Sequence, residues 1–183
     1  MPAPLRTPRA TWIEQGLRAL GVGGPDAIRI ENLADALGVT KGGFYGHFDN
    51  RSAFLGEMLD AWERAVTDRV IEEVDALPGE ARAKLRRLFA IAASIDDMVM
   101  VELAIREWAR RDAAVASRLR RIDNRRMEFM RSLFACFCVD DKEAEVRSFL
   151  AFSLFIANPL ITAEHGSRDR AEVVSSAVEG LLS

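Results

Sequence analysis

The stretch that most constrains the fold of this chain is residues 28–55, IRIENLADALGVTKGGFYGHFDNRSAFL. Its first part carries the apolar stripe of a short helix at positions i, i+3, i+4 and i+7: Ile30, Leu33, Ala34 and Leu37. A turn that contains Gly38 follows, and a second short helix is predicted over 41–48, where Phe44 and Phe48 lie one turn apart. Two short helices joined in this way form a helix-turn-helix, whose second helix can enter the major groove of DNA.

The rest of the sequence predicts an all-α protein of about nine helices. Apolar residues recur every three or four positions nearly throughout, and no run of alternating β-branched residues indicates a strand. Seven further helices are expected, over 12–20, 51–77, 80–94, 98–110, 113–138, 142–163 and 168–182. Asn50 and Asp112 are placed to cap two of these helices, whereas Arg29 has no side-chain oxygen with which to cap the helix that follows it.

The charge of the chain does not by itself single out a nucleic-acid-binding protein. The net charge is −3, and residues 1–62 contain six basic and seven acidic side chains. Groove binding, however, requires positive charge on one face and not across a whole domain. Lys41, Arg51 and an N-terminal arm that bears Arg6 and Arg9 could supply such a face.

Several other classes of protein are disfavoured. The most apolar stretch, 149–161, is too short to cross a bilayer, and the N-terminus lacks the apolar core of a signal peptide, so we expect a cytoplasmic protein with no membrane partner. Cys136 and Cys138 are spaced for neither a disulfide nor a metal pair and are expected to be reduced and mostly packed. No catalytic constellation, phosphate loop or metal-ligand spacing occurs, which argues against an enzyme and predicts no metal or cofactor.

The motif resembles the DNA-binding region of the TetR (tetracycline-repressor-like) family of bacterial transcriptional regulators. Residues 30–34 resemble the family's second helix, 38–40 its turn, and 41–48 its recognition helix with the Tyr-x-x-Phe ending. Asn50-Arg51 with Leu55 resembles the start of the fourth helix. Arg29 departs from the pattern, which usually has Ser or Thr there, so the second helix is expected to start weakly.

This resemblance implies a cytoplasmic, ligand-responsive repressor that acts as a homodimer on a palindromic operator. It implies a helix-turn-helix domain over 1–50 and a helical ligand-binding and dimerisation domain over 51–183, with the linking helix beginning at Arg51. The partners would be double-stranded operator DNA and a small-molecule effector. The dimer would form through the last two helices, of which the first is apolar nearly all round between 149 and 156.

Seven residues are candidates for contacting DNA: Thr40, Lys41, Gly42, Gly43, Tyr45, His47 and Arg51. The Thr40 hydroxyl can cap the recognition helix, and Lys41 can reach a phosphate or a guanine. Gly42 and Gly43 allow either a close approach of DNA or tight packing on neighbouring helices. The remaining three carry donors suited to phosphates.

Eight residues of the second half are candidates for an effector pocket: Met98, Glu102, Arg106, Met127, Met130, Phe134, Phe152 and Phe155. The alternative is that the apolar members fill the core. Glu102 and Arg106 are four residues apart and could either orient a polar ligand group or pair with each other. A second interpretation of the whole chain also stays open, namely a helical ligand-binding or protein-interaction module that does not bind an operator.

Overall fold

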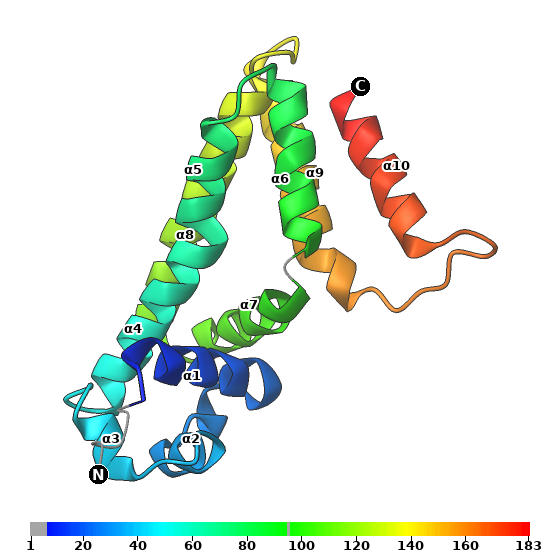
Figure 1. The fold of residues 1–183 in the computed structure, drawn as a ribbon. Helices are drawn as coiled ribbons and strands as arrows, with labels where there is room; N and C mark the ends of the chain where they lie inside the picture. Colours follow the sequence, from blue (N-terminus) through cyan, green and yellow to red (C-terminus); the bar gives the residue numbers. More distant parts are fainter. Residues whose placement is uncertain (1–6, 95) are drawn as a thin grey trace. The chain divides into compact units, whose positions relative to one another are not determined.

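The computed structural model describes residues 7–94 and 96–183, and all regular structure in this part of the chain is helical (Figure 1). The α-helices are α1 (Arg9–Gly23), α2 (Ile30–Ala36), α3 (Lys41–Tyr45), α4 (Arg51–Glu63), α5 (Arg69–Asp75), α6 (Ala81–Ser94), α7 (Asp96–Ala109), α8 (Ala113–Phe134), α9 (Asp141–Ala157) and α10 (Arg170–Leu182). Short turns of 3₁₀-helix cover Pro25–Ala27 and Asn158–Leu160, and a π-helical turn covers Arg64–Asp68. This π-helical turn joins α4 to α5 without a break, so the described residues form nine separate helical rods, and the prediction of an all-α fold is confirmed.

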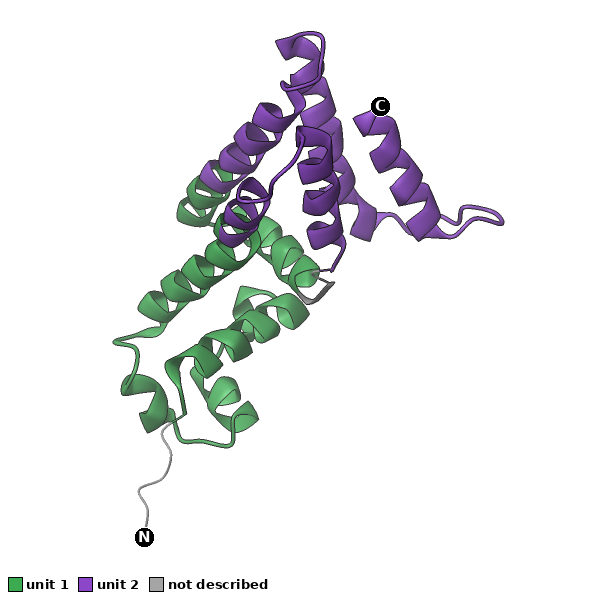
Figure 2. Cartoon of the chain, turned by 45° about the horizontal axis from the view of Figure 1, so that its top comes forward, with its two compact units in different colours: residues 1–68, 96–120 green, residues 69–95, 121–183 purple. Residues whose placement is uncertain are grey.

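The chain divides into two compact units, which are coloured separately in Figure 2. The first comprises residues 1–68 and 96–120, and the second comprises residues 69–95 and 121–183. These units are defined by packing. The first unit therefore contains α7 and the start of α8 as well as α1–α4. The division at residue 50 that the sequence suggests concerns function and stays a prediction.

The first unit is built around α1, which packs against α2, α4 and α7. Large side chains from α1, α3 and α4 are completely buried here: Trp12, Leu20, Phe44, Phe54, Met58 and Trp62. Gly16 allows α1 to approach α4 closely, because a Cβ at this position would lie 2.6 Å from both the Phe54 ring and the Met58 sulfur. The packing of this unit therefore fixes the position of the short helix α3 between larger helices.

The second unit has its own apolar core, to which α5, α6, α8, α9 and α10 contribute. The α10 helix packs against α6 and α9. Arg86 on α6 donates two hydrogen bonds to Glu179 on α10, at 2.9 and 2.8 Å. Arg82 and Arg147 donate to the carbonyls of Leu182 and Leu181 near the end of α10. Two other helices thereby satisfy carbonyl groups that the end of a helix leaves without intrahelical partners.

The helix boundaries differ from the sequence prediction where turn chemistry intervenes. The α3 helix ends at Tyr45 and not at Phe48, in a segment whose glycines give it low helix propensity. The α9 helix ends at Ala157 and not at 163, just before Pro159, which lacks an N–H. Two capping predictions are confirmed: the Asn50 side chain accepts from the Ala53 N–H at 2.9 Å, and the Asp112 side chain accepts from the Ala114 N–H at 2.9 Å.

Candidate nucleic-acid interface

The turn between α2 and α3 has a defined hydrogen-bonding pattern. Gly38 adopts a φ of +65°, which is favourable for glycine and strained for other residues. The Val39 N–H donates to the Ala34 carbonyl at 2.9 Å, and the Gly38 N–H donates to the Asp35 carbonyl at 3.1 Å. This pair of bonds is the Schellman arrangement that ends a helix, so the turn sets the direction in which α3 leaves α2.

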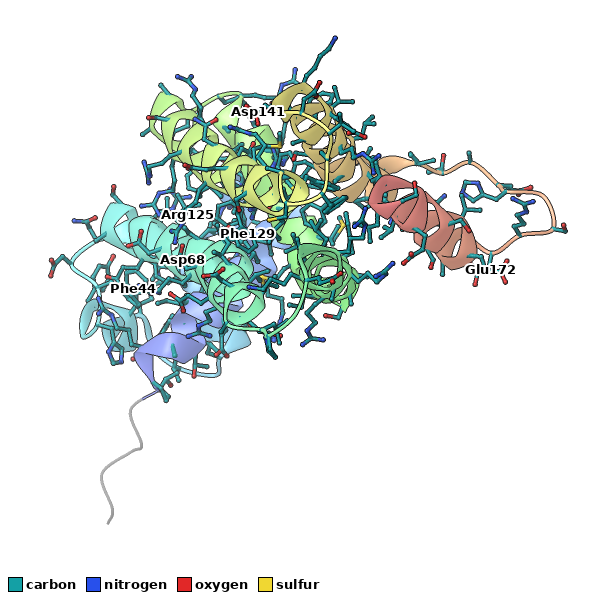
Figure 3. All side chains as sticks on the ribbon, turned by 90° about the horizontal axis from the view of Figure 1, so that it is seen from above. Phe44, Asp68, Arg125, Phe129, Asp141 and Glu172 are labelled. Carbon is teal, nitrogen blue, oxygen red and sulfur yellow. The ribbon has the colours of Figure 1, made fainter. Side chains whose placement is uncertain are left out.

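The buried side of α3 is aromatic. Phe44, which is labelled in Figure 3, and Phe48 are 0% and 2% exposed. The Phe44 ring packs edge-on against Trp12 and Phe54, with ring centroids 5.5 and 5.2 Å apart, and lies 5.0 Å from Phe48. Pairs of this geometry are favourable beyond the apolar area they bury. Aromatic packing against α1 and α4 therefore holds α3 in place despite its low helix propensity.

The other side of α3 faces solvent. Lys41 is exposed, and Tyr45 is 59% exposed although its ring touches Phe44 edge-on. His47 is half-buried just beyond the end of the helix. The buried phenylalanines and the exposed polar residues thus alternate on one short segment, which leaves a polar face of α3 open to a partner.

Thr40 precedes α3 at the N-cap position, but its hydroxyl makes no capping hydrogen bond. This corrects the expectation that the hydroxyl caps the helix. The Gly43 N–H, a usual target of such a cap, donates instead to the Thr40 main-chain carbonyl at 2.9 Å. The first turn of α3 is therefore tightened by the backbone, and the Thr40 side chain is exposed.

Gly42 and Gly43 are not required by the packing of the protein. A Cβ at Gly42 would meet the Thr40 hydroxyl oxygen at 3.6 Å, and a Cβ at Gly43 would meet the Trp12 ring at 3.6 Å. Both are ordinary van der Waals distances, and neither glycine has a positive φ. Of the two explanations for these glycines, tight packing within the protein is therefore disfavoured.

Arg51 and His47, two of the candidate residues, donate hydrogen bonds to main-chain carbonyls within the protein. The Arg51 side chain donates to the Ile28 carbonyl at 2.9 Å and to the Pro25 carbonyl at 2.8 Å, which ties the start of α4 to the segment before α2. The His47 Nε2 atom donates to the Thr7 carbonyl at 2.8 Å. These bonds orient both side chains, and the Arg51 Nη1 group takes no part in them.

Sequence reasoning missed two ion pairs at this surface. Arg9 lies over the Phe48 ring, 5.0 Å from its centroid, and pairs with Glu57 at 2.5 Å. Its basic side chain, which we expected to be available to DNA, is thus engaged within the protein, and Arg6 lies outside the described residues. Glu31 on α2 pairs with Lys41, with 2.5 Å between its Oε1 atom and the Lys41 Nζ atom. The hydrogen bond from Lys41 lowers the pKa of the Glu31 carboxyl. A separation of ten residues gives no signal of such a contact, because it depends on the turn between the helices.

The eight candidates for an effector pocket are divided between the two units. Met98, Glu102 and Arg106 lie on α7 in the first unit, where Arg106 pairs with the buried Glu102 at 2.7 Å. In the second unit, Met130 and Phe134 belong to the buried core, and Met127 and Phe152 pack against it. Phe155 stacks on Phe152 with centroids 6.5 Å apart. The apolar candidates of the second unit are thus brought together.

The family model for bacterial regulatory proteins of the tetR family matches residues 13–58. This part of the chain is of the TetR family. The match begins in α1 and ends in α4, so it covers the helix-turn-helix and part of each of the two helices against which α3 packs. A search of the curated proteins found no match.

Several solved structures share the fold of this chain. A TetR-family transcriptional regulator from Streptomyces coelicolor, SCO4454, has a TM-score of 0.72 and 19% identity, and the match covers 95% of this chain and 93% of that one. A protein from Saccharomonospora viridis in complex with choline has a TM-score of 0.74 and 18% identity, with 94% and 92% covered. AibR, in complex with isovaleryl coenzyme A and operator DNA, has a TM-score of 0.68 and 15% identity, with 94% and 97% covered. At these identities the likeness concerns the fold.

Three further findings concern the part of the chain that the structure describes. None of its helices combines the length and apolar character that crossing a membrane requires. Within the same residues, no group of three or more His, Cys, Asp or Glu side chains is gathered as a metal site would need. Cys138 is half-buried and burial raises its pKa, whereas Cys136 is exposed, so the expectation of packed thiols is wrong for Cys136.

Proposed function

We propose that this protein is a transcriptional repressor that binds a palindromic operator as a homodimer and is released by a small-molecule effector. The main support for the proposal is that the α3 segment has one buried side and one exposed side. Phe44 and Phe48 brace it from within the first unit, while Lys41 and Tyr45 are exposed on its open side. A short helix that is held rigidly and presents polar side chains is suited to entering the major groove of DNA.

The chemistry of the exposed residues favours contacts with the sugar–phosphate backbone. Lys41 supplies an ammonium group, Tyr45 a hydroxyl, and Arg51 a guanidinium that its bonds to backbone carbonyls already orient. Gly42 is exposed and Gly43 is half-buried, and the absence of side chains at both positions would let a duplex approach the backbone of α3. Because few of these groups are donors to base edges, we expect DNA shape to contribute to operator choice.

A homodimer is supported by apolar side chains on the surface of α9. Val146, Phe149 and Leu150 are 50%, 62% and 49% exposed. Such an exposed apolar surface is unusual for a monomer and is suited to covering by a second copy. A two-fold dimer would place its two recognition helices about 34–36 Å, or a multiple of that distance, apart on the duplex.

An effector site is supported by the aromatic and methionine side chains of the second unit, and the ligand set named from the sequence stays part of this proposal. Proteins that share the fold have been crystallised with choline and with isovaleryl coenzyme A. The effector would bind more tightly to a form whose recognition helices do not fit the operator, which lowers the affinity for DNA by linkage. The continuous run of α4, the π-helical turn and α5 would connect the two units during this change.

The proposal is tested by selecting duplexes from a random pool and footprinting the selected site and the protein's own upstream DNA. We expect a palindromic protected site, and we expect the double variant Lys41→Ala with Tyr45→Ala to lose most of its affinity for it. Arg18→Ala is the matched control, because Arg18 is an exposed cation on α1 of the same unit. Selection of no duplex, or full affinity in the double variant, would favour the helical module without operator binding.

A further inference from the structure

The ion pair between Glu31 and Lys41 lies at the water-exposed rim where α2 meets α3. The two side chains are 55% and 56% exposed, and the pair joins the two helices on either side of the turn at Gly38. Apolar residues already hold this corner together, since Leu33, Ala34 and Phe44 are each no more than 2% exposed. Exposed ion pairs contribute little to stability, so the pair is not needed to fix α3.

The carboxylate of Glu31 reduces the positive charge of the surface where α2 meets α3. Lys41 and Arg29 both attract it, and both lower the pKa of its carboxyl, with the hydrogen bond from Lys41 as the largest cause. Glu31 is therefore negatively charged at neutral pH and cancels one of these two positive charges. A phosphate group that approaches Lys41 has to replace the carboxylate and then remain close to it.

The Glu31 carboxylate beside Lys41 should lower the affinity for non-cognate duplexes more than the affinity for the cognate duplex. Non-specific binding depends almost entirely on neutralising phosphates, so a resident anion weakens it directly. A cognate duplex also gains from base contacts and from a fitting shape, which do not depend on Lys41 being unoccupied. An anion beside the recognition helix can thus raise specificity by disfavouring the wrong partners.

We propose that Glu31 is a specificity-determining residue of the DNA-binding surface, whose carboxylate competes with DNA phosphate for Lys41 and suppresses binding to non-cognate duplexes. The inference rests on the proposed function, because it presupposes that α3 contacts DNA. It adds to that function an acidic residue on α2 that acts against binding, whereas the other residues of the surface act in its favour.

The test is Glu31→Gln, which removes the charge and keeps the shape of the side chain. Asp35→Asn is the matched control, because Asp35 is an exposed carboxylate one turn further along α2 and has no ion pair with Lys41. The dissociation constant of each variant is measured over a range of salt concentrations, for a labelled random-sequence duplex and for the selected operator. Thermal unfolding is recorded for each variant to check that the fold is unchanged.

We expect Glu31→Gln to bind the random duplex more tightly. The slope of the logarithm of its association constant against the logarithm of the salt concentration should become steeper by about 0.9, as one additional phosphate contact would cause. Operator affinity should rise less, so the ratio of specific to non-specific affinity falls. Asp35→Asn should not change the slope, and Glu31→Gln should have no effect in a Lys41→Gln background.

Two results would overturn the inference while leaving the proposed function intact. One is a Glu31→Gln variant with the salt dependence of the parent. The other is a variant with weaker operator binding, which would mean that Glu31 orients Lys41 toward DNA. If the parent and every variant bind all duplexes equally, the proposed function itself has failed.

Discussion

Gly16 of α1 and Phe54 of α4 face each other so closely that a Cβ on Gly16 would lie 2.6 Å from the Cζ atom of Phe54. Phe54 cannot easily move away, since it is fully buried and packs against the rings of Phe44 and Phe48. We expect Gly16→Ala to destabilise the protein by about 1–3 kcal/mol, the usual cost of overpacking a core. Urea denaturation monitored by tryptophan fluorescence measures this change.

Gly56→Ala on α4 is the control for that experiment. A Cβ at Gly56 would meet no atom within 4 Å. The substitution should therefore stabilise the protein by about 0.5–1 kcal/mol, because alanine loses less backbone entropy than glycine when a helix forms. Equal effects of the two substitutions would show that α1 and α4 do not approach closely at Gly16.

Gly42→Ala and Gly43→Ala separate folding from DNA binding. Each Cβ would make only ordinary contacts within the protein, so we expect stability to be unchanged or to rise by up to about 1 kcal/mol. Affinity for the operator should fall if a duplex approaches the backbone of α3 at these positions. Thermal unfolding and fluorescence anisotropy with a labelled operator measure the two properties on the same samples. Loss of stability in either variant would contradict the packing described for α3.

Arg51→Ala is expected to lower both stability and DNA affinity. The variant loses the bonds to the carbonyls of Ile28 and Pro25, which should cost about 1–2 kcal/mol. It should also reduce the salt dependence of operator binding by about one phosphate contact. Arg51→Lys should keep the salt dependence but not the stability, because a single ammonium group cannot reproduce the fork of a guanidinium. An unchanged salt dependence in Arg51→Ala would restrict Arg51 to its role within the protein.

The pair of Arg86 and Glu179 predicts a pH dependence of stability. The hydrogen bond from Arg86 lowers the pKa of the Glu179 carboxyl in the folded protein. Its stabilising contribution is therefore fully present above the unfolded pKa and is lost as the pH falls through the folded pKa. Glu179→Gln should be less stable than the parent at neutral pH, and the two should converge in acid. Denaturation of both proteins measured across the acidic range checks this, and a stability difference that stays constant into acid would contradict it.

Phe149→Glu tests the proposed dimer surface. Phe149 is 62% exposed on α9, and a carboxylate there should prevent a second copy from covering the apolar face. We expect the parent to sediment as a dimer and the variant to sediment as a monomer that remains folded. Val139→Glu changes an exposed valine in the turn before α9 and should remain dimeric. A monomeric parent would exclude this surface as the dimer interface.

The local order of the helices follows from the sequence because its signals are local. Apolar periodicity and the turn at Gly38 predict α2 and α3, and the side chains of Asn50 and Asp112 cap the helices that they were expected to cap. The burial of Phe44 and Phe48 also follows from their spacing. Boundaries were less well predicted: α3 is shorter than its apolar spacing suggests, and α9 ends before Pro159.

What the sequence by itself determined is the class of the protein, the helix-turn-helix and the residues that could face DNA, since each depends on neighbours within one or two helical turns. Tertiary structure decided which of those residues already have partners. Lys41 forms an ion pair with Glu31, and Arg51 donates hydrogen bonds to the carbonyls of Pro25 and Ile28. The Thr40 side chain does not cap α3. These contacts depend on the angles at which helices leave their turns and pack together, and those angles are fixed by the buried core.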